Sequence, residues 1–390
     1  MVGGLSGRTA KRVLRARGQA QAKVSNAELF FDLVYVFAVT QLSHKLLGDL
    51  SLAGALQTLL LWFAVWLGWQ YTCWVTNWFE PEALPIRSLL FLLMLLALPM
   101  AAAIPQAFGE RAWVFAGCYA AMQVGRTAYV LFHLGRGHAL APNFQRILGW
   151  VSIAALCWLA GAWFDGPARI ALWVIAVACE YVSPMFGFAL PGLGRSRSSD
   201  WTIDGGHLAE RCQLFVIVAL GESVLVTGAT FGTAHIWDGI TLLAFGVAFT
   251  TSLAMWWVYF DTTSKDGTHA IEHSDDPGRL GAYFHYVHVL IVAGVIVGAV
   301  AAELVIAHPH EHADAAALAT IVGGVALYLL GNAIFKRVVY RRWPRSHLAA
   351  LLALALLAAA GTALDRLVLA ALALVVLIAV AAWDGCRQRS

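Results

Sequence analysis

The chain has 390 residues, of which 60% are hydrophobic and only 13% charged, and its mean hydropathy is +0.71. These values lie far outside the usual balance of soluble domains, so they exclude a sizeable water-soluble domain and predict an integral membrane protein. The net charge of +3 gives no indication of a nucleic-acid partner. The expected partner is the lipid bilayer.

Apolar runs bounded by charges or by Pro and Gly predict twelve membrane-spanning helices and an all-α membrane protein. If the N-terminus lies in the cytoplasm, almost all Lys and Arg residues fall on that side, which is the distribution that the positive-inside rule requires. The exceptions are Lys45, Arg111, Arg169 and Arg366. Both termini are therefore expected in the cytoplasm. The expected spans are 28–47, 52–77, 85–105, 111–134, 146–163, 167–187, 208–230, 236–261, 279–306, 313–338, 346–361 and 364–383.

The two halves of the chain repeat a pattern. Glu210 follows Glu28 by 182 residues, and the same offset lays Trp256 on Trp74. Six spans per half make the halves parallel, so they are expected to be related by an axis along the membrane normal, with a site between them. The predicted domains are a basic cytoplasmic tail (1–24), a first six-helix repeat (25–187), a cytoplasmic linker (188–206), a second six-helix repeat (207–384) and a short cytoplasmic tail (385–390).

The first span begins with Glu28-Leu-Phe-Phe-Asp32, two carboxylates one helical turn apart. Ser25 and Glu28 fit a capping box, in which each side chain accepts a hydrogen bond from the other residue's backbone amide. Glu28 thus has a structural role. Asp32 lies one turn deeper, where an ionisable side chain is costly and is usually functional. We therefore favour Asp32 as a site residue over a packing role.

The seventh span repeats this plan with His207, Glu210 and Arg211 at its beginning and Glu222 further in. Arg211 is expected to extend its guanidinium to the membrane interface. Glu222 lies about 18 Å along the helix, by the rise of 1.5 Å per residue, and is too deep to reach that interface. It is the best single candidate for a site residue.

Two further pairs of polar residues lie inside predicted spans. Arg126 and Glu180 have similar depths, and Glu180 is the favoured carboxylate partner of Arg126. A structural ion pair that holds the first half together and a contact with a substrate are equally good interpretations, because buried charges require partners in both cases. His285 and His288 share one face of the ninth span, where a proton relay and hydrogen-bonded packing are equally good interpretations. Trp69 is one of several tryptophans expected near the membrane interfaces.

The sequence indicates neither a cofactor nor a metal site. Its six cysteines lack the paired spacing of a disulfide framework or a zinc site. The loop histidines and carboxylates are interpreted as solvated, and no phosphate-binding loop, nucleophile elbow or HExxH helix is present. We therefore assign no catalytic residue, no metal ligand and no cofactor.

The segment Val24-Ser25-Asn-Ala-Glu28-Leu-Phe-Phe-Asp32-Leu-Val-Tyr35, followed by Gln41-Leu, resembles the bacterial low-temperature-requirement A family. The segments His207-Leu-Ala-Glu210-Arg211 and Leu214 to Glu222 extend this resemblance, which covers nearly the whole chain. It implies a multi-pass protein of the bacterial cytoplasmic (inner) membrane, associated with growth at low temperature. The motif positions, Gln41 included, become candidate site residues, but the resemblance implies no substrate.

Transport is the leading functional hypothesis: a transporter or an ion or proton pathway, with carboxylates and histidines lining a polar cavity between the halves. The alternative is an intramembrane enzyme that acts on a lipid or an isoprenoid, using the same carboxylates as acid and base. A sensor would need a soluble output domain, and none fits. The identity of the small solute or ion is open. The oligomeric state is open as well, and a homodimer is one possibility.

Overall fold

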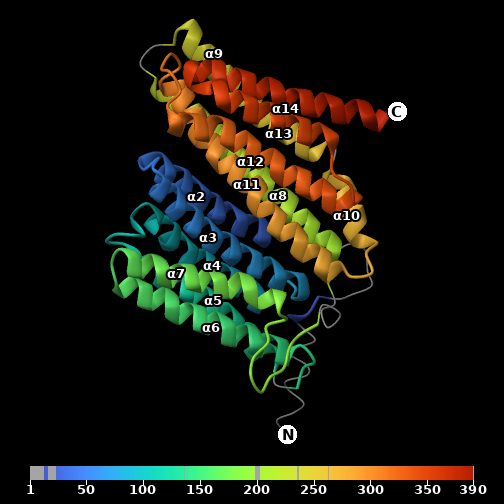
Figure 1. Ribbon diagram of the computed structural model, residues 1–390. Helices are drawn as coiled ribbons and strands as arrows, with labels where there is room; N and C mark the ends of the chain where they lie inside the picture. The colour runs from blue at the N-terminus through green and yellow to red at the C-terminus, as the bar shows by residue number, and fades with distance from the viewer. Residues whose placement is uncertain are drawn as a thin grey trace. The chain divides into compact units, whose positions relative to one another are not determined.

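A computed structural model describes residues 13–15, 23–135, 137–197, 203–234, 237–261 and 263–389. Within these ranges the chain is helical, without a β-sheet, which confirms the all-α class (Figure 1). Most of the basic tail and the middle of the linker, including Trp201, lie outside them. The helices of 16 to 31 residues are α2 (Asn26–Gly48), α3 (Leu52–Trp78), α4 (Leu84–Ala103), α5 (Ala112–Leu134), α6 (Ala141–Trp163), α7 (Pro167–Met185), α8 (Gly205–Thr233), α9 (Gly239–Phe260), α11 (Pro277–Ala307), α12 (Ala315–Tyr340), α13 (Arg345–Ala360) and α14 (Arg366–Arg389); α10 (Ser264–Glu272) is short.

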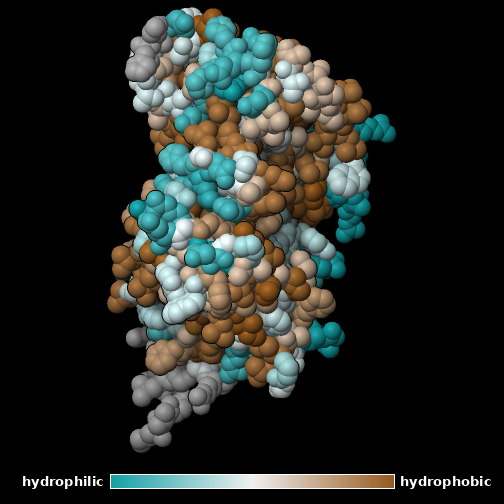
Figure 2. Space-filling model, turned by 60° about the vertical axis from the view of Figure 1, so that its left-hand side comes forward, coloured by the Kyte–Doolittle hydropathy of each residue, from teal (hydrophilic) through white to brown (hydrophobic). Residues whose placement is uncertain are grey.

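Most of these helices have the length and composition of membrane spans. Ten helical stretches in the described residues are long and apolar enough to cross a bilayer. Large apolar side chains are exposed on several of them, for example Leu95 (65%), Leu225 (67%) and Leu356 (66%), and hydrophobic residues occupy much of the face in Figure 2. Such surfaces are stable against lipid. The chain is therefore a polytopic membrane protein.

The two remaining long helices, α2 and α5, carry the buried charges Asp32 and Arg126. Both form over the stretches where the sequence predicts spans. Twelve crossings, the parallel six-helix repeats and cytoplasmic termini stay predictions.

The chain divides into two compact units. The first unit comprises Met1–Lys45, Ala53–Arg211 and Asp275–Leu280, and the second comprises Leu46–Leu52, Cys212–Ser274 and Gly281–Ser390. In the first unit, α5 packs against α4 and α6, and α6 packs against α7. The buried rings of Phe115, Trp158 and Trp173 form its aromatic core, with centroids 5.1 to 5.8 Å apart.

In the second unit, α14 packs against α9, α12 and α13. Helices α11 and α12 approach so closely that a Cβ atom added at Gly294 would lie 2.5 Å from the backbone nitrogen of Tyr328. A Cβ at Gly331 would lie 2.9 Å from the backbone nitrogen of Ile291. Lipid tails are as apolar as the helices, so close packing through small residues holds membrane helices together.

Gly294→Val is therefore expected to destabilise the second unit by about 1–3 kcal/mol, the usual cost of overpacking. The measurement is the apparent melting temperature of the purified protein in detergent. Gly323→Val is the matched control, because Gly323 lies in α12 with no atom within 4 Å of an added Cβ. Equal losses in both variants would contradict the close-packing role.

Candidate functional site

The capping box predicted at the start of α2 is confirmed. The backbone amide of Ser25 donates to Glu28 Oε2 over 2.9 Å, and the backbone amide of Glu28 donates to Ser25 Oγ over 3.3 Å. Glu28 has a second role that the capping pattern does not indicate. Its Oε1 lies 2.9 Å from His207 Nε2 in α8, and both side chains are fully buried.

Arg211 occupies the centre of this region. Its Nη2 donates to Asp32 Oδ1 over 2.7 Å, and its Nη1 lies 3.5 Å from Glu28 Oε1. The expectation that Arg211 reaches the membrane interface is wrong, because its side chain is 0% exposed. Two carboxylates one turn apart on α2 compensate the guanidinium inside the unit, which is the condition for burying a charge.

One face of α3 completes this cluster with residues at helical spacings of four. Trp69 Nε1 donates to Asp32 Oδ1 over 2.7 Å, Arg211 Nη2 lies 3.3 Å from Cys73 Sγ, and Asn77 Nδ2 lies 3.2 Å from His207 Nδ1. Trp69 is fully buried, so its ring packs inside the unit and does not face lipid as a residue of an aromatic belt does. The spacing 69, 73, 77 is the signal that the sequence analysis missed.

Arg15 joins the cluster from the segment before α2. Its Nη2 lies 3.3 Å from Glu28 Oε2 and 3.2 Å from His207 Nε2. Its backbone is fixed as well, since Arg15 N donates to the carbonyl of Trp78 over 3.0 Å. The basic composition of the N-terminal tail gives no signal that distinguishes Arg15 from its neighbours.

The α2–α3–α8 cluster thus consists of Arg15, Glu28, Asp32, Trp69, Cys73, Asn77, His207 and Arg211. Several of its buried polar atoms have no hydrogen-bond partner among the described residues. They are Asp32 Oδ2, Arg15 Nε, Arg211 Nε and Arg211 Nη1. The hydroxyl of Tyr35, outside the cluster but on the same face of α2 as Asp32, has no partner either. The cluster therefore contains both an acceptor and donors that are not satisfied by the protein.

A second polar network links α5 and α7 in the same unit. Glu180 accepts hydrogen bonds from Tyr119 Oη (2.9 Å), Gln123 Nε2 (2.9 Å) and Trp158 Nε1 (3.4 Å). Gln123 Oε1 accepts from Arg126 Nη2 over 2.6 Å. The predicted direct ion pair between Arg126 and Glu180 is therefore wrong. An amide has both a donor and an acceptor, so Gln123 connects the guanidinium to the carboxylate.

The two networks approach each other at Gly68 of α3. Arg126 Nη1 donates to the carbonyl of Gly68 and to Thr72 Oγ1, each over 3.2 Å. The hydroxyl of Tyr35 lies 2.8 Å from the position of a Cβ atom at Gly68. Tyr35 also follows Asp32 by three residues in α2, on the same face of the helix. Tyr35 thus lies between the α5–α7 network and the α2–α3–α8 cluster.

The candidate histidines lie in the second unit. His288 Nε2 is 2.6 Å from the hydroxyl of Tyr259, and its Nδ1 is 2.6 Å from the carbonyl of Phe284. His285 Nδ1 lies 2.9 Å from the carbonyl of Gly281. Both are fully buried. These contacts agree with the packing interpretation and leave the relay as a prediction.

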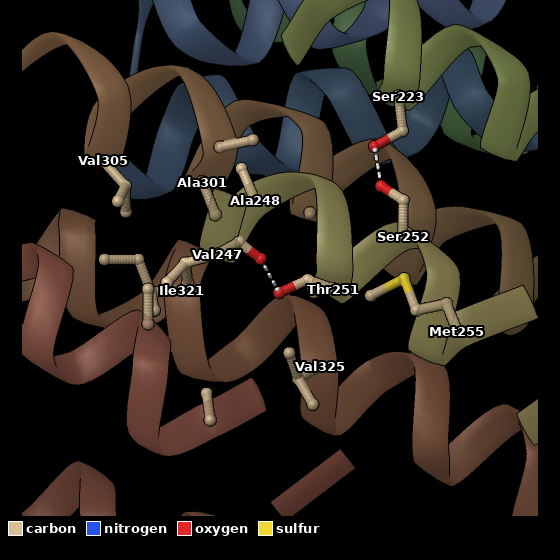
Figure 3. A pocket seen from close by; sticks show the side chains of 14 residues that line it. Ser223, Val247, Ala248, Thr251, Ser252, Met255, Ala301, Val305, Ile321 and Val325 are labelled. Carbon is tan, nitrogen blue, oxygen red and sulfur yellow. Dashed lines mark hydrogen bonds between the residues drawn. The ribbon is translucent and has the colours of Figure 1, made fainter. Parts of the chain in front are cut away.

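Glu222 is 7% exposed and also lies in the second unit. The next residue, Ser223, contacts Ser252 (3.2 Å between the hydroxyl oxygens) at the wall of a cavity of about 40 Å³, shown in Figure 3. The structure gives no polar contact to Glu222 within the described residues. The same holds for Gln41 and Glu210, which are half-buried. A shared cavity for Asp32 and Glu222 stays a prediction.

In the described part of the chain, no group of three or more His, Cys, Asp or Glu side chains is arranged to hold a metal ion. The polar side chains of the α2–α3–α8 cluster include carboxylate, imidazole and guanidinium groups. These groups bind anions and cations and exchange protons.

Comparisons with known proteins agree on one family. The model of the bacterial low temperature requirement A protein matches residues 23–382. An uncharacterized protein of Rhizobium meliloti is 37% identical over 377 residues, which cover 95% of this chain and 91% of that protein. No solved structure matches the chain. Because the family model and this relative both extend over nearly the whole chain, the protein belongs to the bacterial low temperature requirement A family.

Proposed function

We propose that the protein is a transporter or ion pathway of the bacterial cytoplasmic membrane, and that the ion is the proton. The α2–α3–α8 cluster is the proposed binding site. The observation that carries this proposal is the set of unpartnered buried atoms at the cluster: Asp32 Oδ2, the hydroxyl of Tyr35, Arg15 Nε, Arg211 Nε and Arg211 Nη1.

Unpartnered buried polar atoms destabilise a folded protein. Leaving a buried polar atom without a hydrogen bond costs about 1–3 kcal/mol, and more when the group is charged. Folded proteins rarely keep several of them together unless water, an ion or a ligand satisfies them. Here the atoms include one carboxylate acceptor and several donors. This combination suits water, a hydronium ion or a small polar solute, and does not suit an apolar molecule.

The titratable groups of the cluster support the proton as the transported ion. Glu28 and His207 are in direct contact at 2.9 Å, and Arg211 connects the same carboxylate to Asp32. Carboxylate and imidazole side chains inside a membrane protein are the groups that form proton relays in pumps and transporters. Tyr35 and Arg126, which both approach Gly68, lie between these groups and the Gln123–Glu180 pair. Buried Asp, Glu and His side chains of this kind are typical of proton pathways in membrane proteins.

Proton flux into liposomes tests the proposal. The purified protein is reconstituted with a trapped pH dye, and a potassium gradient with valinomycin supplies the driving force. We expect the wild type to acidify the lumen and Asp32→Asn to lose this flux, because the amide keeps the shape of the side chain but binds no proton. Glu82→Gln is the control, since Glu82 is an exposed acid whose ion pair with Arg87 is long, at 4.0 Å.

Unchanged flux in a folded Asp32→Asn variant would remove the cluster from the pathway. The same assay addresses the deeper acid of α8: Glu222→Gln is expected to abolish flux if Glu222 shares the pathway with Asp32. Flux in Glu222→Gln equal to that of Glu82→Gln would restrict the pathway to the first unit.

The enzymatic alternative has weaker support. An apolar groove of about 590 Å³ lies between α3 and α7, and its only polar lining residues are Gln57 and Tyr181. Acid–base catalysis requires a titratable group within hydrogen-bond reach of the reacting atom. Glu180, the nearest acid in sequence, is 1% exposed and surrounded by three donors. The groove is thus better suited to binding than to catalysis.

A further inference from the structure

The groove between α3 and α7 belongs entirely to the first unit. Leu56, Leu60 and Phe63 of α3 line one side, and Val174, Ala178 and Tyr181 of α7 line the other. Leu56 and Val174 are about half exposed (56% and 49%). The groove is therefore open along the surface of two helices that are long and apolar enough to span the membrane.

The dimensions suit one hydrocarbon chain. From Ala53 to Phe63 the groove follows α3 for about 15 Å, by the helical rise of 1.5 Å per residue. Its volume of about 590 Å³ lies in the range of cavities that bind small molecules, roughly 300–1,000 Å³. The lining along this length is apolar except for Gln57 and Tyr181, which are hydrogen-bonded to Lys45 and to the carbonyl of Phe63. An acyl chain would therefore bury its surface without leaving a polar group unsatisfied.

One end of the groove carries a positive charge. Lys45 Nζ donates to Gln57 Oε1 over 3.1 Å and lies 5.3 Å from the centre of the Phe108 ring. Gln57 and Phe108 both line the groove, so the ammonium group is held at its rim. This is the end of the first unit where α2 finishes and α3 begins. The distribution of basic residues predicts that this end faces the outside of the membrane.

An apolar groove with a cation at its rim matches the chemistry of an anionic phospholipid. We propose that this groove is a binding site for such a lipid, with one acyl chain between α3 and α7 and the phosphate at Lys45. The site binds a membrane component, and the titratable side chain in its lining, Tyr181, donates its hydroxyl to the carbonyl of Phe63. The proposal does not depend on proton transport.

Native mass spectrometry of the protein released from detergent tests the site, with phosphatidylglycerol and phosphatidylcholine of identical acyl chains as probes. One basic residue near an anionic headgroup changes affinity by about fivefold. The first phosphatidylglycerol is therefore expected to bind about fivefold more tightly than the first phosphatidylcholine. Equal affinities for the two lipids would overturn the proposal.

Two matched pairs of variants locate the site. Ala178→Trp fills the groove and is expected to remove the first bound lipid, whereas Ala171→Trp, an exposed position on the same helix outside the groove, is expected to retain it. Lys45→Gln should lower phosphatidylglycerol affinity to that of phosphatidylcholine, and Arg111→Gln at the same end should leave it unchanged. Equal effects within either pair, or copurification of an uncharged isoprenoid that Ala178→Trp displaces, would overturn the assignment.

Discussion

Arg211→Leu is expected to lower the free energy of unfolding of the first unit by about 3–5 kcal/mol, the usual loss when one partner of a buried ion pair is removed. The guanidinium contacts Asp32 at 2.7 Å and Glu28 at 3.5 Å, and all three side chains are fully buried. Its removal leaves the indole N–H of Trp69 as the hydrogen-bond donor to Asp32. Unfolding by SDS titration in mixed micelles measures the change.

The controls separate charge burial from general sensitivity to mutation. Arg111→Leu removes an exposed guanidinium whose hydrogen bond goes to the carbonyl of Ala102, and a change below about 0.5 kcal/mol is expected at such a surface site. The double variant Arg211→Leu with Asp32→Leu should recover part of the loss, because the uncompensated carboxylate is removed together with its partner. A double variant as unstable as the sum of the two single variants would mean that Arg211 and Asp32 are energetically independent.

Arg126→Leu is expected to destabilise the first unit by a similar amount, about 3–5 kcal/mol, because its guanidinium is the cation of the α5–α7 network. Three acceptors lose a donor in this variant: the carbonyl of Gly68, which still accepts from Thr72 Oγ1, and the side-chain oxygens Thr72 Oγ1 and Gln123 Oε1. Glu180→Leu removes the carboxylate at the other end of the same network. The two losses are expected to be non-additive, with an interaction energy of about 0.5–3 kcal/mol in a double-mutant cycle.

Repeating this double-mutant cycle without the Gln123 side chain tests whether that side chain connects the two charges. Its side chain is the connection between Arg126 and Glu180, so the interaction energy should largely disappear when the cycle is repeated in a Gln123→Leu background. A cycle between Arg126→Leu and Arg146→Leu is the control, because Arg146 binds Asn143, Ser196 and the Leu193 carbonyl instead. Interaction energy that persists without Gln123 would indicate that the two charges interact directly.

The sequence by itself determined the class of this protein and much of its secondary structure. Long apolar runs can satisfy their backbone polar groups in lipid only as helices, so composition alone predicts a helical membrane protein. The Ser25–Glu28 capping box is equally local, because both partners lie within one turn. The motifs around Glu28, Asp32, His207 and Arg211 could be singled out as well, since polar residues are rare in such helices.

Only the tertiary structure decided how these residues are paired. Glu28 and His207 are 179 residues apart, and no helical periodicity relates α2 to α8. The approximate depth of Arg126 and Glu180 favoured a direct pair, but depth does not specify the rotation of a helix about its axis, and that rotation places Gln123 between them. Arg211 was expected at the interface for a related reason. Snorkelling is the lowest-energy solution for an isolated arginine, whereas two carboxylates from another helix make burial more favourable.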